Sequence, residues 1–130
     1  MYVLDTNTLI YYFKGIGKVA DIMLNHPPFA IGIPTVVLFE LEVGLAKSIS
    51  SRERRTQLEK VTSIVNVLPF GATEAQCAAA VRAELEMKGT PIGPYDILIA
   101  GTALANKSTL VTHNRKEFER VNDLRIEDWY

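Results

Sequence analysis

Short apolar runs alternate along this chain with longer segments of helical character, and this alternation restricts the possible folds more than any other feature of the sequence. The apolar runs predict strands at Tyr2–Leu4, Phe29–Ile33, Ile64–Leu68 and Thr109–Thr112, with a further edge strand at Leu124–Glu127. Helices are predicted at Thr6–Phe13, Lys18–Leu24, Pro34–Ser48, Ser51–Ser63, Thr73–Lys88, Tyr95–Asn106 and Arg115–Arg120. Strands separated by helices predict an α/β fold, with a parallel sheet covered by helices on both faces.

The expected helix ends follow from local chemistry. Thr6 is a candidate cap for the first helix, because its hydroxyl can accept a hydrogen bond from a free backbone N–H. Thr73 and Gln76 have the spacing of a capping box, and Gly89 can end the helix that begins there. Pro34 is well placed in the first turn of its helix, because that turn needs no N–H from it.

The length and composition point to one compact domain, residues 1–130. No apolar stretch approaches the length of a signal sequence or membrane span, so we expect a cytoplasmic protein without a membrane partner. The net charge of −1 argues against nonspecific coating of nucleic acid, although it leaves room for a local basic rim. The single cysteine, Cys77, lies at helical spacing with Val81 and Leu85 and is expected in the core.

Acidic residues occur at separate points of the chain, each inside or next to an apolar segment: Asp5, Glu40, Asp96 and Glu117. Carboxylates in such places are costly to desolvate unless a positive charge gathers them. A hard divalent cation such as Mg²⁺ or Mn²⁺, which prefers oxygen ligands, is the usual agent. Asp5 and Glu117 follow predicted strands, and ligands bind beyond the carboxyl ends of such strands. The sequence therefore predicts metal-assisted chemistry at this edge.

Local spacing leaves three questions open. Asp5 is either a metal ligand supported by Thr6 and Asn7, or the end of a strand before a capped helix. Asp96 is either a site residue or a helix cap. Glu40 and the nearby Glu42 both have apolar helical neighbours, so periodicity cannot choose between them.

Two other motifs are weak. The glycines at Gly15 and Gly17 fit part of a dinucleotide-binding pattern, but they follow a helix instead of a strand. His26 and His113 have no histidine partner at the spacing of a zinc site. His113 retains a chance of substrate contact, because it adjoins Asn114.

Taken together, segments spread over nearly the whole chain resemble the PIN-domain ribonucleases, and in particular the VapC-type toxins of bacterial toxin–antitoxin modules. These segments are Val3–Asn7, Glu40–Gly44, Gly93–Ala103 and Leu110–Phe118. The resemblance implies a single PIN domain with a three-layer α/β/α fold and a mostly parallel sheet of four to five strands. It also selects Glu40, which with Asp5 and Asp96 would bind Mg²⁺ or Mn²⁺. Glu117 would complete the catalytic acids, while supporting or substrate-orienting roles fall to Thr6, Asn7, Thr112 and Asn114.

The implied activity is metal-dependent endonucleolytic cleavage of RNA, including structured RNA such as tRNA, which would inhibit translation. The implied partners are a second copy of the chain and a VapB-type antitoxin, for which Val36–Ala46 and Ser51–Ser63 are candidate surfaces. Two rival functions are a phosphatase of the haloacid dehalogenase type and a non-catalytic binding module. The phosphatase would normally carry an acid where this chain has Asn7, and the intact acids argue against the binding module.

Overall fold

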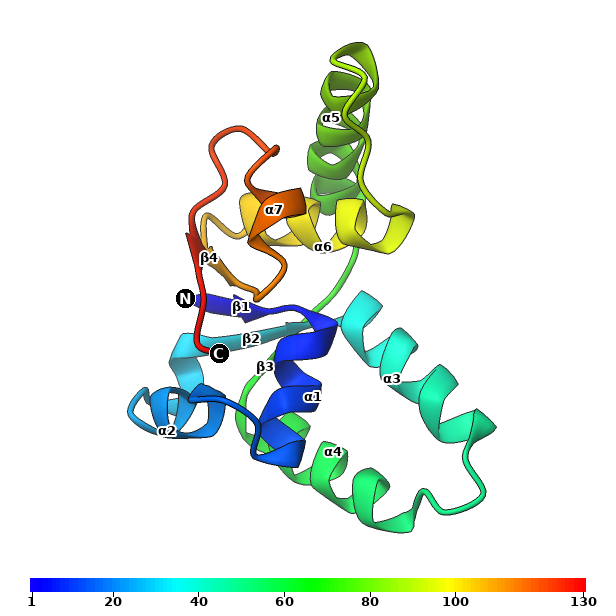
Figure 1. Cartoon of the computed structure of the whole chain (residues 1–130), viewed down its shortest axis with the longest axis vertical. Coiled ribbons are helices and arrows are strands. Elements are labelled where there is room, and N and C mark those ends of the chain that lie inside the picture. The colour runs from blue at the N-terminus through cyan, green and yellow to red at the C-terminus, as the bar shows by residue number, and fades with distance from the viewer.

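A parallel five-stranded sheet forms the centre of the molecule in a computed structural model that describes residues 1–130 (Figure 1). The strand order is β3-β2-β1-β4-β5, and every neighbouring pair is parallel. The strands are β1 (Tyr2–Leu4), β2 (Ile31–Pro34), β3 (Asn66–Leu68), β4 (Thr109–Val111) and β5 (Ile126–Glu127). This topology confirms the prediction of a parallel sheet, with the last strand at its edge.

Helices cover both faces of the sheet and complete three layers. The helices are α1 (Thr6–Lys14), α2 (Val19–Leu24), α3 (Thr35–Lys47), α4 (Arg52–Ile64), α5 (Ala72–Met87), α6 (Pro94–Ala105) and α7 (Arg115–Phe118), with a 3₁₀ turn η1 (Pro28–Ala30). In Figure 1, α5, α6 and α7 lie on one side of β1 and β2, and α1, α2 and α4 lie on the other. Helix α3 leaves the carboxyl end of β2 and contacts both α1 and α6. None of the helices has the combined length and apolar character needed to cross a membrane.

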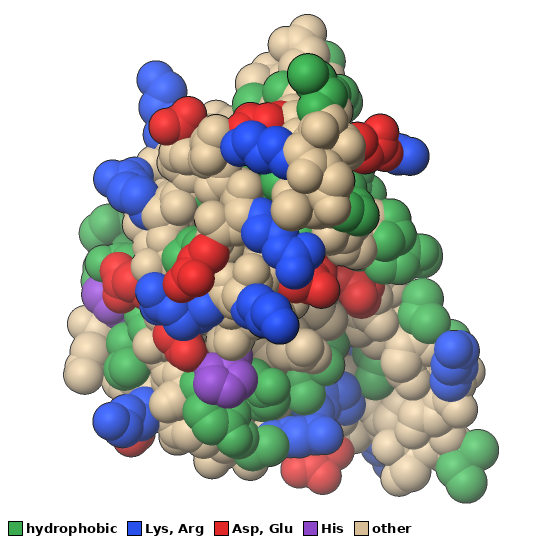
Figure 2. All heavy atoms as spheres, turned by 45° about the horizontal axis from the view of Figure 1, so that its top comes forward, with side chains coloured by type: hydrophobic (Ala, Val, Ile, Leu, Met, Phe, Trp, Pro, Cys, Tyr) green, Lys and Arg blue, Asp and Glu red, His purple; other side chains and the backbone are tan.

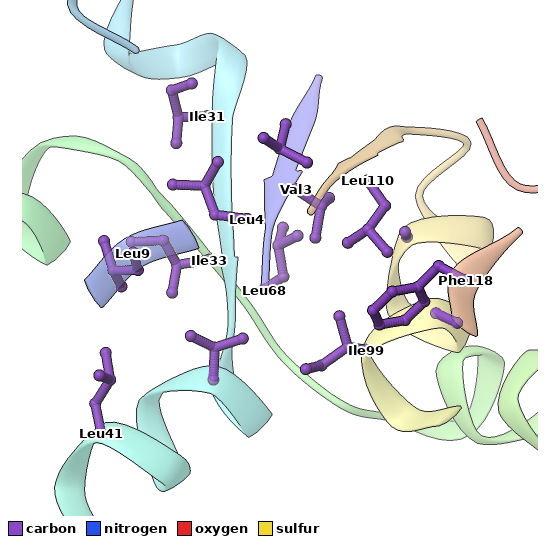
Figure 3. Close-up of a cluster of buried hydrophobic side chains, with 14 of the residues drawn as sticks. Val3, Leu4, Leu9, Ile31, Ile33, Leu41, Leu68, Ile99, Leu110 and Phe118 are labelled. Atoms are coloured by element: carbon purple, nitrogen blue, oxygen red, sulfur yellow. The ribbon is translucent and has the colours of Figure 1, made fainter. Parts of the chain in front are cut away.

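The inner strands are buried on both faces, as expected for a parallel sheet between helical layers. Successive residues of β1 point to opposite sides: Val3 lies with Phe118 on the side of α6 and α7, whereas Leu4 lies on the side of Leu9 and α1 (Figure 3). All four of these side chains are fully buried. The apolar strand residues therefore fix the sheet between its two helical layers.

Two predicted helix caps are wrong. The cap of α1 is Asp5, whose carboxylate accepts from the Thr8 N–H, while the Thr6 hydroxyl makes a contact elsewhere. The cap of α5 is Gly71, and its N–H donates to Glu74 Oε1 at 2.7 Å. The side-chain acceptor at this helix start is therefore Glu74, whereas the sequence predicted a capping box made by Thr73 and Gln76. In α1 and α5 the cap lies one and two residues before the predicted one.

Other boundaries shift by a few residues. The second strand begins at Ile31 and not at Phe29, because Pro27 and Pro28 direct the chain into the 3₁₀ turn η1. Pro34 ends this strand and caps α3 instead of lying within its first turn. Cys77 is only half-buried on α5.

Helices α5 and α6 approach closely at one glycine. A methyl group built on Gly101 would lie 2.6 Å from the Cβ of Ala78 and 2.7 Å from its backbone nitrogen. Since backbone cannot yield as a flexible side chain can, only glycine fits at this crossing. This contact fixes the helix that carries Asp96 against α5.

Candidate active site

The register of β1 and β4 brings Asp5 and Thr112 together. Leu4 pairs with Val111, so the residue after each strand emerges at the same edge of the sheet. Thr112 Oγ1 donates to Asp5 Oδ2 at 2.6 Å, and the Thr8 N–H donates to Asp5 Oδ1 at 2.9 Å. Burial raises the pKa of Asp5 above its ordinary value, although these hydrogen bonds oppose the rise. Asp5 is thus a rigidly held carboxyl group at the carboxyl end of the sheet.

Tertiary contacts separate Glu40 from Glu42. Thr6 Oγ1 donates to Glu40 Oε1 at 2.7 Å, which holds this carboxylate next to the residue that follows Asp5. Glu42 is exposed and accepts two hydrogen bonds from Arg55, at 2.6 and 2.7 Å. The structure therefore directs Glu40, and not Glu42, toward Asp5.

Asp96 and Glu117 come from opposite ends of the α6–β4–α7 segment and interact directly. Burial and a hydrogen bond to the Glu117 carboxyl group raise the pKa of Asp96 to about 7, and the negative charges of Glu117, Asp5 and Glu40 add to the rise. Gly93 caps α6, and the Asp96 carboxylate makes no capping hydrogen bond. The capping alternative for Asp96 is therefore wrong, and Asp96 lies within electrostatic reach of the other three predicted acids.

We call Asp5, Glu40, Asp96 and Glu117 the acid cluster. Asn114 links the Asp5 side of this cluster to Glu117. Its N–H donates to Thr112 Oγ1 at 2.9 Å, and its side-chain amide donates to Glu117 Oε2 at 3.1 Å. A chain of hydrogen bonds thus runs from Asp5 through Thr112 and Asn114 to Glu117. Asn7, in contrast, is exposed, and its side chain forms no hydrogen bond within the protein.

Two further residues contribute to the site although sequence reasoning missed them. The buried Thr8 supplies its N–H to Asp5, and its hydroxyl donates to the Val111 carbonyl at 3.1 Å. Its position three residues after an acid that ends a strand is the signature of a capped helix and could have identified it. Asp128 adds negative charge near Asp5. It comes from the C-terminal tail, and no local pattern indicates that contact.

The prominent apolar hollows of the surface lie away from these acids. One is lined by residues of α5 and α6 together with the intervening loop, and a smaller one by residues of α1, α2 and α4. Neither contains a residue of the acid cluster. The chemistry indicated by the charges therefore belongs to the rim of the sheet and not to the most apolar cavity.

Comparison with known proteins identifies the family of this chain. Residues 2–124 match the family described as the PIN domain. The chain belongs to the PIN-domain family. Its relatives include the tRNA(fMet)-specific endonuclease VapC of Salmonella typhimurium, 38% identical over 98% of this chain and 97% of the relative. Ribonuclease VapC2 of Rickettsia felis is 37% identical, over 99% and 98% of the two chains.

Solved structures of PIN-domain proteins share the fold. The DNA-bound VapBC complex from Salmonella typhimurium contains a chain that superimposes with a TM-score of 0.92 at 36% identity, covering 99% of this chain and 98% of that chain. The VapBC2 complex from Rickettsia felis, bound to a promoter DNA fragment, gives 0.89 at 34% identity, again covering 99% and 98%. These matches confirm the predicted three-layer PIN fold.

The PIN-domain acids fit a divalent cation in the chemistry of their donors. All are carboxylates, the ligand type that Mg²⁺ and Mn²⁺ prefer, and burial together with the charges of the other acids raises the pKa of Asp96. The side chains do not form a closed ligand set: no three His, Cys, Asp or Glu residues are placed closely enough to hold a metal ion. Hydrogen bonds from Thr6 and Thr112 hold Glu40 and Asp5 in their present positions.

Loss of the Thr112 hydroxyl should weaken the fold of this PIN domain. We expect Thr112→Val to lower the free energy of unfolding by about 1–3 kcal/mol, because the buried Asp5 carboxyl group loses a donor. Urea denaturation measures this loss, and an unchanged m-value shows that the shift of the midpoint reports stability alone. Thr102→Val is the matched control, since Thr102 is equally buried but only donates back to its own helix, at the Leu98 carbonyl. Equal losses in the two variants would contradict a specific role for Thr112.

Proposed function

We propose that this protein is a metal-dependent endoribonuclease that acts as the toxin of a VapBC-type toxin–antitoxin pair. The observation that carries the proposal is the convergence of Asp5, Glu40, Asp96 and Glu117 at one end of the sheet, from four separate parts of the chain. Relatives named as VapC nucleases, which match nearly the whole chain, support the proposal. We also propose that residues 1–130 form a single PIN domain.

In this proposal Asp5, Glu40 and Asp96 hold Mg²⁺ or Mn²⁺, and Glu117 completes the site through a longer reach. A bound divalent cation supplies Lewis-acid chemistry, which lowers the pKa of water and neutralises charge on a phosphodiester. Thr112 and Thr6 keep the carboxylates of Asp5 and Glu40 oriented.

Asp96 and Glu117 would also control when a cation and RNA bind at the site. Their mutual repulsion makes a positive charge favourable beside Asp96, and it disfavours RNA at this site until that charge is neutralised. Asn114 fixes the Glu117 carboxylate. Asn7 is exposed at the rim and free to contact substrate.

The proposed substrate is RNA, with tRNA as a specific candidate because the Salmonella relative is named as a tRNA(fMet)-specific endonuclease. The proposed partners are a VapB-type antitoxin and a second copy of this chain, on the basis of the solved VapBC complexes. Helices α3 and α4 diverge from a shared loop (Figure 1) and are our candidate surfaces for these partners.

Purified protein free of antitoxin should cleave total RNA when Mg²⁺ or Mn²⁺ is added. We expect no cleavage in EDTA, because without a cation the negative charges of the acid cluster repel the phosphodiester and nothing neutralises the charge that develops on it. Gel analysis of RNA with chelator, and with metal restored in excess, measures this dependence. Equal cleavage in EDTA would contradict the metal mechanism, and absence of cleavage under all conditions, with tRNA included, would contradict the ribonuclease assignment.

A further inference from the structure

The loop between β4 and α7 holds two carboxylates of the acid cluster. Thr112 donates to Asp5, and Asn114 donates to Glu117. His113 lies between these two donors, and its own backbone N–H and carbonyl form no hydrogen bond within the protein. The side chain of His113 is therefore what fixes the middle of the β4–α7 loop.

Three side chains hold the His113 ring. Its Nδ1 lies 2.9 Å from Asp128 Oδ2, within hydrogen-bond distance. The ring stacks on Tyr130, with centroids 4.0 Å apart and planes 18° apart. Tyr11 of α1 packs edge-on against both rings, with its centroid 6.2 Å from that of His113 and 5.1 Å from that of Tyr130. We call Asp128, Tyr130 and Tyr11 the His113 clasp.

The segment that carries Asp128 and Tyr130 is anchored in the core. The Asp128 carboxylate accepts from the Tyr130 N–H at 3.0 Å, which fixes the turn between them. Trp129, between these two residues, is buried and packs on Tyr2 and His26, with ring centroids 5.2 and 5.4 Å away. Because Trp129 lies in the core, the packing of the core sets the position of the clasp.

A glycine in the turn between α1 and α2 allows Tyr130 to approach. Gly17 has a φ of +66°, and a methyl group built on it would lie 3.0 Å from two backbone atoms of Tyr130. Gly15 has the same φ, but a methyl group there would meet no atom within 4 Å. Both positions favour glycine for its left-handed backbone. Only Gly17 is also required by the clasp.

The contacts of the His113 ring favour an internal role over substrate contact. Asp128 engages one ring nitrogen, and Tyr130 covers one face of the ring. Nearby, Arg115 pairs with Glu119. On the face shown in Figure 2, acidic and basic side chains are interspersed and not gathered into one basic patch. The partners of the ring, and not the surrounding charge, therefore indicate what His113 does.

We propose that His113 and its clasp are positioning residues for the acid cluster, because they hold the loop that orients the carboxylates of Asp5 and Glu117. This inference rests on the proposed metal-dependent function and adds how the site keeps its geometry. Groups that orient metal ligands through hydrogen bonds alter metal affinity when they are lost. A change at the clasp should therefore weaken cation binding, although no clasp residue belongs to the acid cluster.

Gly17→Ala tests the inference, with Gly15→Ala as the matched control. Both variants place alanine at the same strained φ, but only the methyl group at Gly17 displaces Tyr130. In metal-free protein, the Asn114 amide that donates to Thr112 should exchange with solvent about tenfold faster in Gly17→Ala than in Gly15→Ala. Calorimetry should show Mg²⁺ affinity about tenfold lower in Gly17→Ala alone. Equal exchange rates or equal affinities in the two variants would overturn the proposal.

Two substitutions of Asp128 separate geometry from charge. Asp128→Ala and Asp128→Asn remove the same negative charge, which lies near Asp5. Only asparagine keeps an oxygen for the Tyr130 N–H and a polar group for His113. We expect Asp128→Ala to bind Mg²⁺ about tenfold more weakly than Asp128→Asn, which should retain most of the wild-type affinity. Equal affinities in the two variants would show that Asp128 acts through its charge alone and would overturn the role of the clasp.

His113→Ala distinguishes positioning from contact with RNA. A positioning role predicts weaker Mg²⁺ binding and, at saturating Mg²⁺, an unchanged KM for an RNA oligonucleotide. A raised KM with unchanged Mg²⁺ affinity would assign the ring to substrate contact and overturn the proposal. Absence of Mg²⁺ binding by the wild-type protein would also overturn it. A wild-type protein that binds Mg²⁺ but cleaves no RNA would contradict the ribonuclease function alone, and the exchange rates and affinities would still decide the role of the clasp.

Discussion

Replacing Glu40 with Gln is expected to reduce RNA cleavage by more than about 100-fold, since loss of a supporting group around a metal alone costs 10–100-fold. The proposed ligand would lose its charge, while Thr6 would retain an oxygen acceptor at nearly the same place. The fold should therefore survive. Cleavage rates at saturating Mg²⁺, together with growth after expression in a host cell, measure the effect.

Glu42→Gln is the matched control for this prediction. Glu42 lies on the same helix, but it is exposed and paired with Arg55. An exposed ion pair contributes little to stability, and this one is remote from the acid cluster. Activity should stay near that of the wild type. If Glu42→Gln were inactive and Glu40→Gln active, Glu40 would not be the acid that serves the site.

Asp96→Asn should abolish cleavage and yet stabilise the metal-free protein. Burial, and after it the neighbouring Glu117, Asp5 and Glu40, disfavour the ionised form of Asp96 and raise its pKa to about 7. Removing this charge should relieve on the order of 1–2 kcal/mol near neutral pH, after allowance for partial exposure. For a chain of this size that corresponds to a melting temperature about 3–8 °C higher. Thermal melting in EDTA measures the change.

The pH dependence gives this prediction a second test. The folded protein binds a proton at Asp96 up to about pH 7, whereas the unfolded chain releases it near the ordinary value of 3.8. The stability that depends on this group is therefore greatest at low pH and falls as the pH rises from about 4 to about 7. The gap between mutant and wild type should be small at pH 4 and largest above pH 7. A mutant that melts below the wild type at neutral pH would show that Asp96 serves the fold and not the site.

The layered fold could be predicted from sequence because its signals are local. Apolar runs such as Tyr2–Leu4 and Thr109–Val111, separated by helical segments, indicate a parallel sheet without knowledge of any contact. The same reading placed Asp5 and Glu117 beyond strand ends, where ligands bind in such sheets. Helix caps were less predictable: Asp5 and Gly71 compete with Thr6 and Thr73 for the same role, and local propensities are nearly equal.

The sequence by itself determined that acids would lie at the carboxyl edge of an α/β sheet, because chain direction and apolar spacing are written in consecutive residues. Only the tertiary structure decided which acids interact. The Thr6 hydroxyl donates to Glu40 and not to Glu42. The pairing of Leu4 with Val111 brings Thr112 within hydrogen-bond distance of Asp5. These contacts join residues far apart in the chain, so their side-chain positions depend on strand register and helix packing. Local spacing carries no information about either.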